Sequence, residues 1–586
     1  MNEFLQYYES ELAYMHRALG EFERTHPQKA SQLQISAGRS QDPDLQRIAD
    51  SFALIAARLN QRLDGSRPEI SLDLLRMMCP GFMLGAPSYA TLAPSAEMLE
   101  KRTKLERGTA VYFDKDGSPF CKYSVARDVT LVPASIEKVK IENAPFRFEV
   151  PREAKGAEVA ICITVGSTDR EASLKAILDN AFEFYVTENS FRKNRICNFF
   201  AGPLKGISIA ADAQDTGTSL PVGQLVPTLC LSDANILPTF LTQPPGMELL
   251  RDYLCYPDKG SFFTLSNLQE ALPDGPLMEI RFFAGAQSIS EMGQIEKEDF
   301  LMNVVPCINL FTSSSQPCRY DFARDRVPVS PISQTKSKTN VLRIETVHKI
   351  TSDGEFKLSE MTDPQRQVTQ SEIRWHERHL FGQWDKSRRE ISFSVKDGQP
   401  KSIDFIADLL CSNGSGGMVP RPGDLARVEL GPLTGVEFYF LAEPTASVVV
   451  PENTAWQWKI LSLINGNFGA ILDAASSVQA LREALNISSP TGHSGAAEGI
   501  TEVLHSEAIA PVRIGKNMIL AAGTIVEVVI DVDLLPYPSF IFARVLDDFL
   551  AAFVSYDRFV ELRVRARGET VPIVQFPRRH GSQLGT

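Results

Sequence analysis

The chain has 586 residues, of which 43% are hydrophobic, 23% charged and 9% aromatic, which is the composition of an ordinary folded protein. Because a single hydrophobic core stops growing near ~250–300 residues, this length predicts several domains. The chain has 60 Lys and Arg against 72 Asp and Glu, which gives a formal charge of −12, and no long basic run offsets this acidity. Nucleic-acid binding requires a basic surface that releases counterions from phosphates, so the composition disfavours that class of function.

The amino-terminal region has the residue spacing of amphipathic helices. Apolar residues recur three or four positions apart and would share one face of a first helix. These residues are Phe4, Tyr8, Leu12, Met15, Leu19 and Phe22. A second helix is predicted from Asp42, an N-cap residue before Pro43, to Gly65. A shorter apolar run ends at Pro80, so residues 1–90 are predicted to be helical.

The local composition of the chain changes after Pro94. Short β-branched and aromatic segments alternate with Gly, Pro, Asn and Asp, which predicts strands and turns up to about residue 450. Helical interruptions are expected near residues 171–185 and 244–256. The central part is therefore predicted to consist of β-rich domains.

The carboxy-terminal part predicts a mixture of helices and strands. A buried helix is expected from Trp456, a flexible loop over 488–499 and a strand over 525–532. A further helix is expected from Ser539. The last strand is expected over 560–566, with one solvent-exposed (wet) and one buried (dry) face, because its apolar residues alternate with charged ones.

These expectations define an α+β, multidomain fold class. The predicted divisions are a helical region at 1–90, β-rich segments at 91–240, 241–345 and 346–450, and an α+β domain at 451–586.

Three motifs were considered as sites for chemistry. His376 and His379 flank Glu377, but zincins place their histidines at i and i+4 with the glutamate between them, so no metal site is predicted and surface or strand-edge histidines are expected. The segment 492–496 resembles a nucleophile elbow, but it ends in Ala and follows no apolar strand, so it is interpreted as part of a linker. The Gly-rich segment 413–417 lacks the ending of a phosphate loop and is interpreted as a turn.

The nine cysteines are scattered, without a metal-binding spacing or a paired pattern. They are expected to be reduced thiols that pack as small hydrophobes in a reducing compartment. The amino terminus lacks both the basic and the apolar region of a signal peptide, and no segment has the ~18 uninterrupted apolar residues of a membrane span. The protein is therefore expected in the cytoplasm, without catalytic, cofactor-binding or metal-binding residues.

Short stretches along nearly the whole chain have the order and spacing of one known family. In the helical region they are Tyr8–Leu12, Glu21, Phe22, His26, Pro27, Ala30, Asp42, Pro43, Phe52, Ala53, Ala57, Arg58, Pro68, Glu69, Leu74, Leu75, Pro80, Pro87 and Ser88. Later they are Arg107–Thr109, Leu249–Tyr253, Tyr256–Lys259, Pro306, Asn309–Phe311, Trp458–Leu461, Val545, Leu546 and Phe549. Together they resemble the TssF (ImpG/VasA) family of type VI secretion systems. Two stretches depart from the family pattern, 82–86 and 461–472.

The resemblance implies a non-enzymatic subunit of a secretion baseplate, with a fold like that of the large wedge subunit in contractile phage tails. It further implies that two copies pair with one TssG in a wedge and that six wedges surround the VgrG spike. TssK, TssE and the sheath proteins would be further neighbours, with the assembly docked at the cytoplasmic side of the inner membrane.

The residues themselves leave two points open. The apolar face Phe4, Tyr8, Leu12, Met15, Leu19 and Phe22 is a candidate partner interface, because such spacing forms seams between helices, but it is equally compatible with packing inside its own domain. The alternative functions are a contractile phage tail wedge protein and a β-rich hydrolase or glycan-binding protein.

Overall fold

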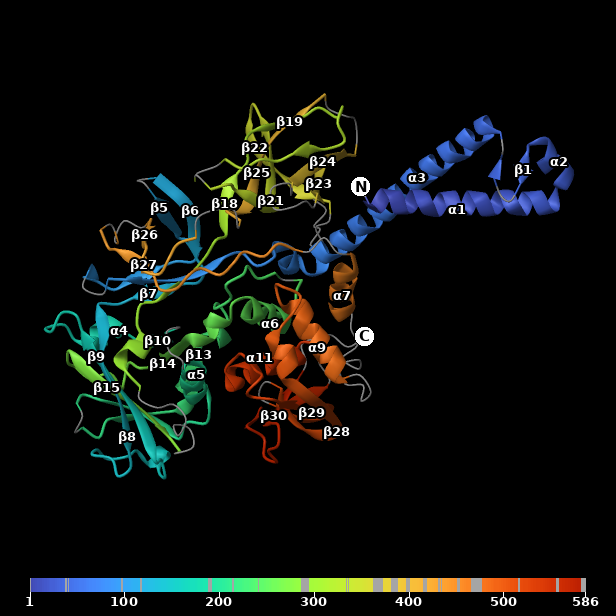
Figure 1. Ribbon diagram of the computed structural model, residues 1–586. Helices are drawn as coiled ribbons and strands as arrows, with labels where there is room; N and C mark the ends of the chain where they lie inside the picture. Colours follow the sequence, from blue (N-terminus) through green and yellow to red (C-terminus); the bar gives the residue numbers. More distant parts are fainter. Residues whose placement is uncertain are drawn as a thin grey trace. The chain divides into compact units, whose positions relative to one another are not determined.

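The structure is a computed structural model (Figure 1). It describes residues 2–580 except 37–38, 41, 96–97, 116–117, 188–191, 213–214, 241, 286–294, 333–334, 336, 362–372, 381–387, 397–400, 415–418, 430–432, 434, 451–453, 465–476, 515–516 and 555–557. The chain forms two compact units. The helical unit comprises residues 1–76 and 453–461, and the β-rich unit comprises residues 77–452 and 462–586.

The helical unit is built from the amino-terminal segments and one helix from late in the chain. Its elements are α1 (Asn2–Thr25), α2 (Pro27–Gln32), the ribbon of β1 (Ile35–Ser36) and β2 (Arg39–Ser40), most of α3 (Pro43–Met78), and α7 (Thr454–Ile464). Ser71 on α3 hydrogen-bonds the side chain of Gln457 on α7, and both residues are buried. The predicted first helix and the helix near Trp456 are confirmed.

The predicted end of the second helix at Gly65 is wrong, because α3 continues to Met78. An isolated glycine costs a helix about 1 kcal/mol relative to alanine, and this is too little to end a helix whose following turns contribute apolar contacts. Leu72 and Leu75 in those turns are buried. The separate apolar run expected before Pro80 therefore belongs to the same helix.

A closed barrel lies at the centre of the β-rich unit. Its strands follow the order β17 (Val305–Ile308), β3 (Tyr89–Pro94), β27 (Phe438–Phe440), β26 (Leu425–Val428), β5 (Ala110–Lys115) and β6 (Ser118–Val125). A barrel has no free strand edge, and its interior is filled by side chains that include Leu92, Val111 and Phe438. Its strands come from four of the five predicted ranges, since β3 begins at Tyr89 within the first of them. The division of the chain into these five ranges stays a proposal.

Two sheets formed by residues 134–301 share an aromatic core. One has the order β12 (Thr218–Leu220), β11 (Gly206–Ala210), β15 (Leu277–Ala284), β9 (Val159–Ser167) and β8 (Ala134–Asn143). The other has the order β13 (Leu225–Pro227), β14 (Phe262–Ser266), β10 (Ala181–Val186) and β16 (Phe300–Leu301). Phe200 on α5 (Lys193–Ala201) contacts aromatic rings of both sheets. The centre of its ring lies 5.0 Å from that of Phe282 on β15 and 5.6 Å from that of Phe263 on β14. The two sheets and α5 therefore form one core.

A further sheet spans residues 311–412. Its order is β18 (Phe311–Ser314), β25 (Ile403–Ser412), β21 (Asn340–Thr351), β22 (Gly354–Glu360), β23 (Ile373–Leu380), β24 (Arg388–Val395) and β20 (Val327–Pro328), and β19 (Cys318–Tyr320) pairs with β25. Its core includes Trp375, Phe393 and Phe405. Together with the barrel, it confirms the predicted β-rich centre.

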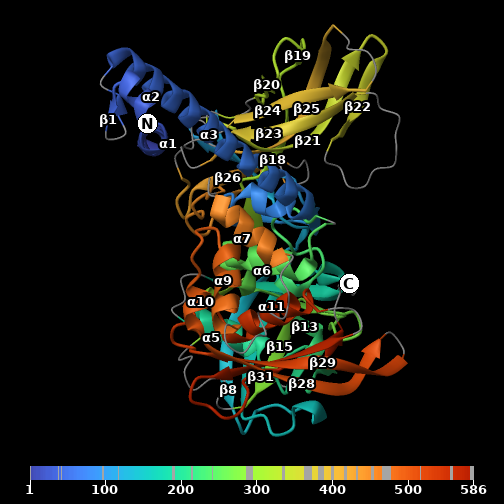
Figure 2. The same cartoon turned by 90° about the vertical axis from the view of Figure 1, so that its right-hand side faces the viewer.

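The carboxy-terminal sheet is covered on one face by helices (Figures 1 and 2). Its strands are β28 (Ile500–Ile514), β29 (Asn517–Ile530), β30 (Phe559–Ala566), β31 (Val574–Gln575) and β32 (Arg579–His580). The helices on the sheet are α9 (Ser477–Ser488) and α11 (Ser539–Ala551), and α11 connects the parallel strands β29 and β30. Helix α6 (Pro245–Cys255) packs against α11 and α9. The predicted helix at Ser539 and strand near 525 are confirmed, and so is the α+β fold class.

The expected wet face of the closing strand is wrong at Glu561, which is 2% exposed. The chain beyond β30 returns over this face, and Arg563, Gln575 and Arg578 donate hydrogen bonds to the Glu561 carboxylate at 2.6–3.0 Å. A buried carboxylate is tolerated when its oxygens are paired in this way. Alternation within β30 could not reveal the tail that covers it.

Helices α6 and α11 approach closely at Gly246, where a Cβ atom would lie 2.1 Å from the carbonyl oxygen of Asp548. We expect Gly246→Ala to destabilise the protein by ~1–3 kcal/mol, because the two helices must separate. The midpoint of urea unfolding, followed by circular dichroism, measures this effect. Gly223→Ala is the matched control, since a Cβ at Gly223 meets open space. Equal midpoints for the two variants would contradict the close packing.

Candidate functional site

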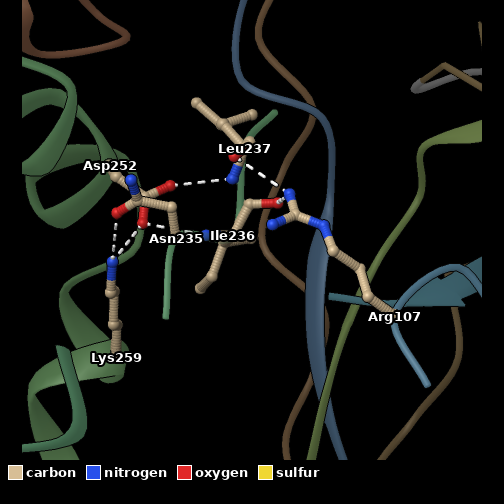
Figure 3. Close-up of polar contacts among 6 residues, drawn as sticks. All are labelled: Arg107, Asn235, Ile236, Leu237, Asp252 and Lys259. Carbon is tan, nitrogen blue, oxygen red and sulfur yellow. Dashed lines mark hydrogen bonds and ion pairs between the residues drawn. The ribbon is translucent and has the colours of Figure 1, made fainter. Parts of the chain in front are cut away.

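Helix α6 presents the carboxylates of Glu248 and Asp252 to the segment 236–240, which is the centre of a buried polar network. Figure 3 shows the part of this network around Asp252. The Asp252 carboxylate accepts hydrogen bonds from the backbone N–H groups of Ile236 at 3.0 Å and Leu237 at 2.9 Å. One turn earlier, Glu248 accepts from the N–H of Phe240 at 2.7 Å. Residues four apart share one face of a helix, so α6 fixes the path of this otherwise irregular segment.

Asp252 also forms a buried ion pair. Lys259, on the short 3-10 helix Pro257–Ser261, places its Nζ 2.5 Å from Asp252 and 3.2 Å from the side-chain oxygen of Asn235. The two charged side chains are only 4% and 2% exposed. Removing either partner would leave an uncompensated charge in a low-dielectric interior, which is far more costly than losing an exposed pair.

Arg107 holds the same segment from the opposite side. Its guanidinium donates to the carbonyl oxygens of Ile236 at 3.1 Å and Leu237 at 3.0 Å. Burial lowers the pKa of Arg107 from its ordinary value, although the nearby Asp252 carboxylate opposes this effect. Asp252 thus binds the N–H groups and Arg107 the carbonyl groups of two consecutive residues. We call Arg107, Asn235, Ile236, Leu237, Asp252 and Lys259 the polar hub.

The other side of α6 fixes the chain that leads into the barrel. Arg251 donates to the carbonyl oxygen of Gly85 at 2.5 Å, and its guanidinium lies 4.9 Å from the centre of the Phe82 ring. Tyr256 donates to the carbonyl oxygen of Pro87 at 2.9 Å. Gly85 has φ +65 and a Cβ there would lie 2.3 Å from the Val448 carbonyl, so only glycine fits this turn. The stretch 82–86, which departs from the family pattern, is therefore anchored by α6.

The chemistry of the polar hub is that of a structural site. Both Asp252 oxygens accept hydrogen bonds and one also pairs with Lys259, so the carboxylate is poorly placed to remove a proton from a substrate. A general base needs a free acceptor within reach of a bound molecule. Asp252 binds the protein's own backbone, and Lys259 binds the side chains of Asp252 and Asn235.

A second buried network joins the barrel to the sheet of residues 311–412. The side chain of Asn309 donates to the carbonyl oxygen of Lys122 at 3.0 Å, and its oxygen accepts from Ser412 and from the backbone of Asn413. The Asn413 side-chain oxygen accepts from the backbone of Lys122 at 2.9 Å. Asn413 and Gly414 thus belong to a structural turn, while residues 415–417 of the Gly-rich segment lie outside the described part. No sequence signal distinguished these amides from surface ones.

The histidine motif is divided between the two faces of β23. Glu377 and His379 are buried, and Glu377 pairs with Arg389 at 2.6 Å. His376, three residues before His379, lies on the opposite face, because side chains alternate along a strand. Within the described residues, no group of three or more His, Cys, Asp or Glu side chains is placed to hold a metal ion. The expected surface position of His379 is wrong, and β23 lies between β22 and β24 instead of at an edge.

Ser494 caps a helix and is not placed as a nucleophile. Its hydroxyl accepts from the backbone N–H of Ala496 at the start of α10 (Gly495–Gly499), and its own N–H donates to Asn486 at 2.8 Å. The hydroxyl of Ser489 donates to the carbonyl oxygen of His493 at 2.7 Å. The predicted loop over 488–499 is wrong at its two ends, because α9 continues to Ser488 and α10 begins at Gly495, while the flexibility of the residues between them stays a prediction.

All nine cysteines are free thiols, and seven of them are buried. Burial raises the pKa of Cys79 and Cys162 to about 12 and that of Cys255 to about 11. A thiol is a nucleophile only as the thiolate, so these cysteines are inert at neutral pH. Their packing as small hydrophobes agrees with the expectation from the sequence.

The candidate partner interface lies on α1. Tyr8, Leu12, Met15, Leu19 and Phe22 are half-buried in the structure, and the side chain of Phe4 lies outside the described part. A more exposed apolar stripe occurs on α3, where Ile48 is 55%, Phe52 61% and Ile55 64% exposed. A helix was predicted here from the sequence, but the exposure of this stripe was not. Across the described residues, no helix combines the length and apolar character of a membrane span.

Comparison with known proteins identifies the family. The model of the family described as "Type VI secretion system, TssF" matches residues 1–583, and the chain belongs to this family. A curated relative, the type VI secretion system component TssF1 of Pseudomonas aeruginosa, is 21% identical over 614 residues, which cover 97% of this chain and 97% of the relative. The family suggested by the short stretches is thus confirmed.

Two solved structures have the same fold. One is a chain of the TssK-TssF-TssG baseplate subcomplex of a type VI secretion system, determined by cryo-electron microscopy. It superposes with a TM-score of 0.71 at 18% identity, covering 92% of this chain and 99% of that chain. The other belongs to the baseplate complex of a type VI secretion system, with a TM-score of 0.61 at 17% identity, covering 99% and 100% of the two chains.

We expect Asp252→Asn to destabilise the protein by ~3–5 kcal/mol, because Lys259 remains buried without its counter-charge. The midpoint of urea unfolding reports this loss. Asp404→Asn is the matched control: Asp404 pairs with Arg319 at the surface, where such pairs contribute about 0–1 kcal/mol. If both variants unfold at the same urea concentration, the hub does not stabilise the fold.

Glu248 predicts a specific dependence of stability on pH. Burial raises the pKa of Glu248 from 4.5 to about 7, so between these values the folded state binds more protons than the unfolded state. The contribution of Glu248 to stability therefore falls as pH rises through this window. We expect Glu248→Gln to match the wild type near pH 4.5 and to exceed its thermal midpoint at pH 8. The exposed Glu270→Gln should match the wild type at both pH values, and a pH-independent effect of Glu248→Gln would contradict the shift.

Proposed function

We propose that this chain is a non-enzymatic structural subunit of a type VI secretion baseplate. The observation that carries the proposal is the similarity of nearly the whole chain, in family and in fold, to TssF chains of baseplate complexes. The interior supports it, since buried charges, amides and hydroxyls are used to join segments of the chain to each other. The function would therefore be to hold partners in position.

The proposed partners are TssG and TssK, with a second copy of the chain in the same wedge. In this arrangement two copies bind one TssG, six wedges surround VgrG, and TssE and the sheath proteins contact the assembled ring. The complex would be cytoplasmic and docked at the inner membrane. Firing would proceed by rigid-body movement between subunits, because stiff, fully packed units change their contacts at interfaces.

The helical unit is the proposed site of contact with TssG. The half-buried face of α1 and the exposed stripe Ile48, Phe52 and Ile55 on α3 supply apolar surface at helical spacing. A helix with such a stripe is stabilised when a partner helix covers it. This extends the candidate interface of Phe4, Tyr8, Leu12, Met15, Leu19 and Phe22 by a second helix.

We expect the double variant Phe52→Ser, Ile55→Ser to fold normally but to lose the complex with TssG. Both side chains are mostly exposed, so their replacement costs the free chain little, whereas it removes apolar contacts from the interface. Co-expression with the TssG-like protein, followed by mass determination of the purified complex, measures the outcome. The wild type should give a two-to-one complex.

Val571→Ser provides the matched control, because Val571 is 70% exposed in the β-rich unit and should leave the complex intact. A wild-type chain that stays monomeric with TssG present would contradict the proposed function. A two-to-one complex that survives the double variant would instead remove only the α3 stripe from the interface.

A further inference from the structure

A polar cleft of about 380 Å³ opens beside the polar hub within the β-rich unit. One wall is the ribbon of β4 (Thr103–Leu105) and β7 (Val129–Leu131), and the others come from β10, β14 and the segment 228–234. Its volume falls in the range of ~300–1,000 Å³ that is typical of ligand sites. The cleft belongs to none of the motifs that the sequence analysis considered.

The walls of the cleft carry charges of both signs, and nearly all of them are paired. Arg127 pairs with Glu183 at 2.5 Å, Lys104 with Asp128 at 2.6 Å, and Arg102 with Asp179 at 3.0 Å. Every cation of the lining thus has a carboxylate partner on the same walls.

Asp233 is the exception among the charged residues of the lining. It is exposed at the cleft and makes no hydrogen bond or salt bridge within the described part of the chain. The pKa of Lys104 is raised mainly by its ion-pair partner Asp128, and Asp233 adds only a minor electrostatic effect in the same direction. With three cations and four carboxylates in the lining, the balance is one negative charge. A cationic ligand group would complete the pairing.

The apolar part of the lining suits an aliphatic stem that ends in this charge. Val129, Val132 and Met302 lie in the walls. Leu231, two residues before Asp233 in the sequence, is 39% exposed. Lysine and arginine side chains bury their methylene groups along such surfaces while the charged end meets a carboxylate. A simple metal ion would not use this apolar surface, and an anion would be repelled by the unpaired carboxylate.

We propose that the cleft receives a lysine or arginine side chain from an extended segment of a partner protein, with Asp233 as its counter-charge. The lining also carries peptide-binding chemistry, since it includes Thr130, which is exposed on β7, and the half-buried Asn180. A hydroxyl and an amide can hydrogen-bond a peptide backbone that crosses the mouth. The inference does not depend on the proposed role in secretion, because it rests on the lining alone.

The test uses the full chain and three fluorescein-labelled pentapeptides of sequence Gly-Val-X-Val-Gly, where X is lysine, norleucine or glutamate. Fluorescence anisotropy at low salt should show binding of the lysine peptide, at least about tenfold weaker binding of the norleucine peptide, and none of the glutamate peptide. Binding should weaken as NaCl increases, because the contact with Asp233 is partly exposed and is screened.

Two variants assign the binding to the cleft. Asp233→Asn should weaken the lysine peptide by about tenfold, whereas the exposed Glu270→Gln should leave its affinity unchanged. Thr130→Trp should fill the mouth and abolish binding, while an unchanged circular dichroism spectrum reports that the strand is intact. Equal binding of the lysine and glutamate peptides, or no effect of Asp233→Asn, would overturn the proposal. So would full competition by free cadaverine at equal concentration, which would indicate a small-amine site.

Discussion

The β-rich unit depends on the burial of one ion pair that is saturated by backbone hydrogen bonds. Asp252 and Lys259 could not remain in the interior as isolated charges, because desolvation of each costs several kcal/mol. The pair is tolerated since Asp252 also binds two N–H groups of the segment 236–237, whose carbonyl groups bind Arg107. These contacts join four stretches of the chain: those around Arg107, 235–237, Asp252 and Lys259. We infer that the ion pair fixes the mutual arrangement of these stretches more than it adds to the net free energy of folding.

This constraint matters because the barrel beside it is assembled from distant parts of the sequence. Strands β17 and β27 both pair with β3, although about 210 and about 345 residues of chain separate them from it, and loop closure over such lengths costs entropy. The contacts of Arg251 and Tyr256 with the chain just before β3 position the first of these strands. Asn309 fixes the chain just after β17 to β6 and to the end of β25. Polar networks thus join the elements at points where the apolar spacing of the sequence does not determine how the strands align with each other.

The sequence predicted those features that depend on local pattern. Apolar spacing located α1, the start of α3, α7 and α11, and β-branched texture located the strands of the centre. Features that depend on distant residues were missed. The burial of Glu561 requires a tail that returns over β30, and the roles of Asn309 and Asn413 require three segments to converge. Arg107, Asp252 and Lys259 of the polar hub lie in stretches that were named through a family resemblance, whereas Asn235, Ile236 and Leu237 were not named. Nothing in the spacing indicated that Arg107 and Asp252 bind opposite sides of one peptide segment.

The distribution of polar groups separates the two kinds of surface that a scaffold protein needs. In the interior, charged side chains of the hub and of the Glu561 cluster bind their own chain, so that the β-rich unit can move as a single body. On the helical unit, apolar side chains of α3 remain exposed, and at the cleft a single carboxylate remains unpaired. These buried contacts and the exposed apolar groups are complementary. A partner that covers the exposed groups would gain contacts without breaking the buried hydrogen bonds that join the segments of the fold.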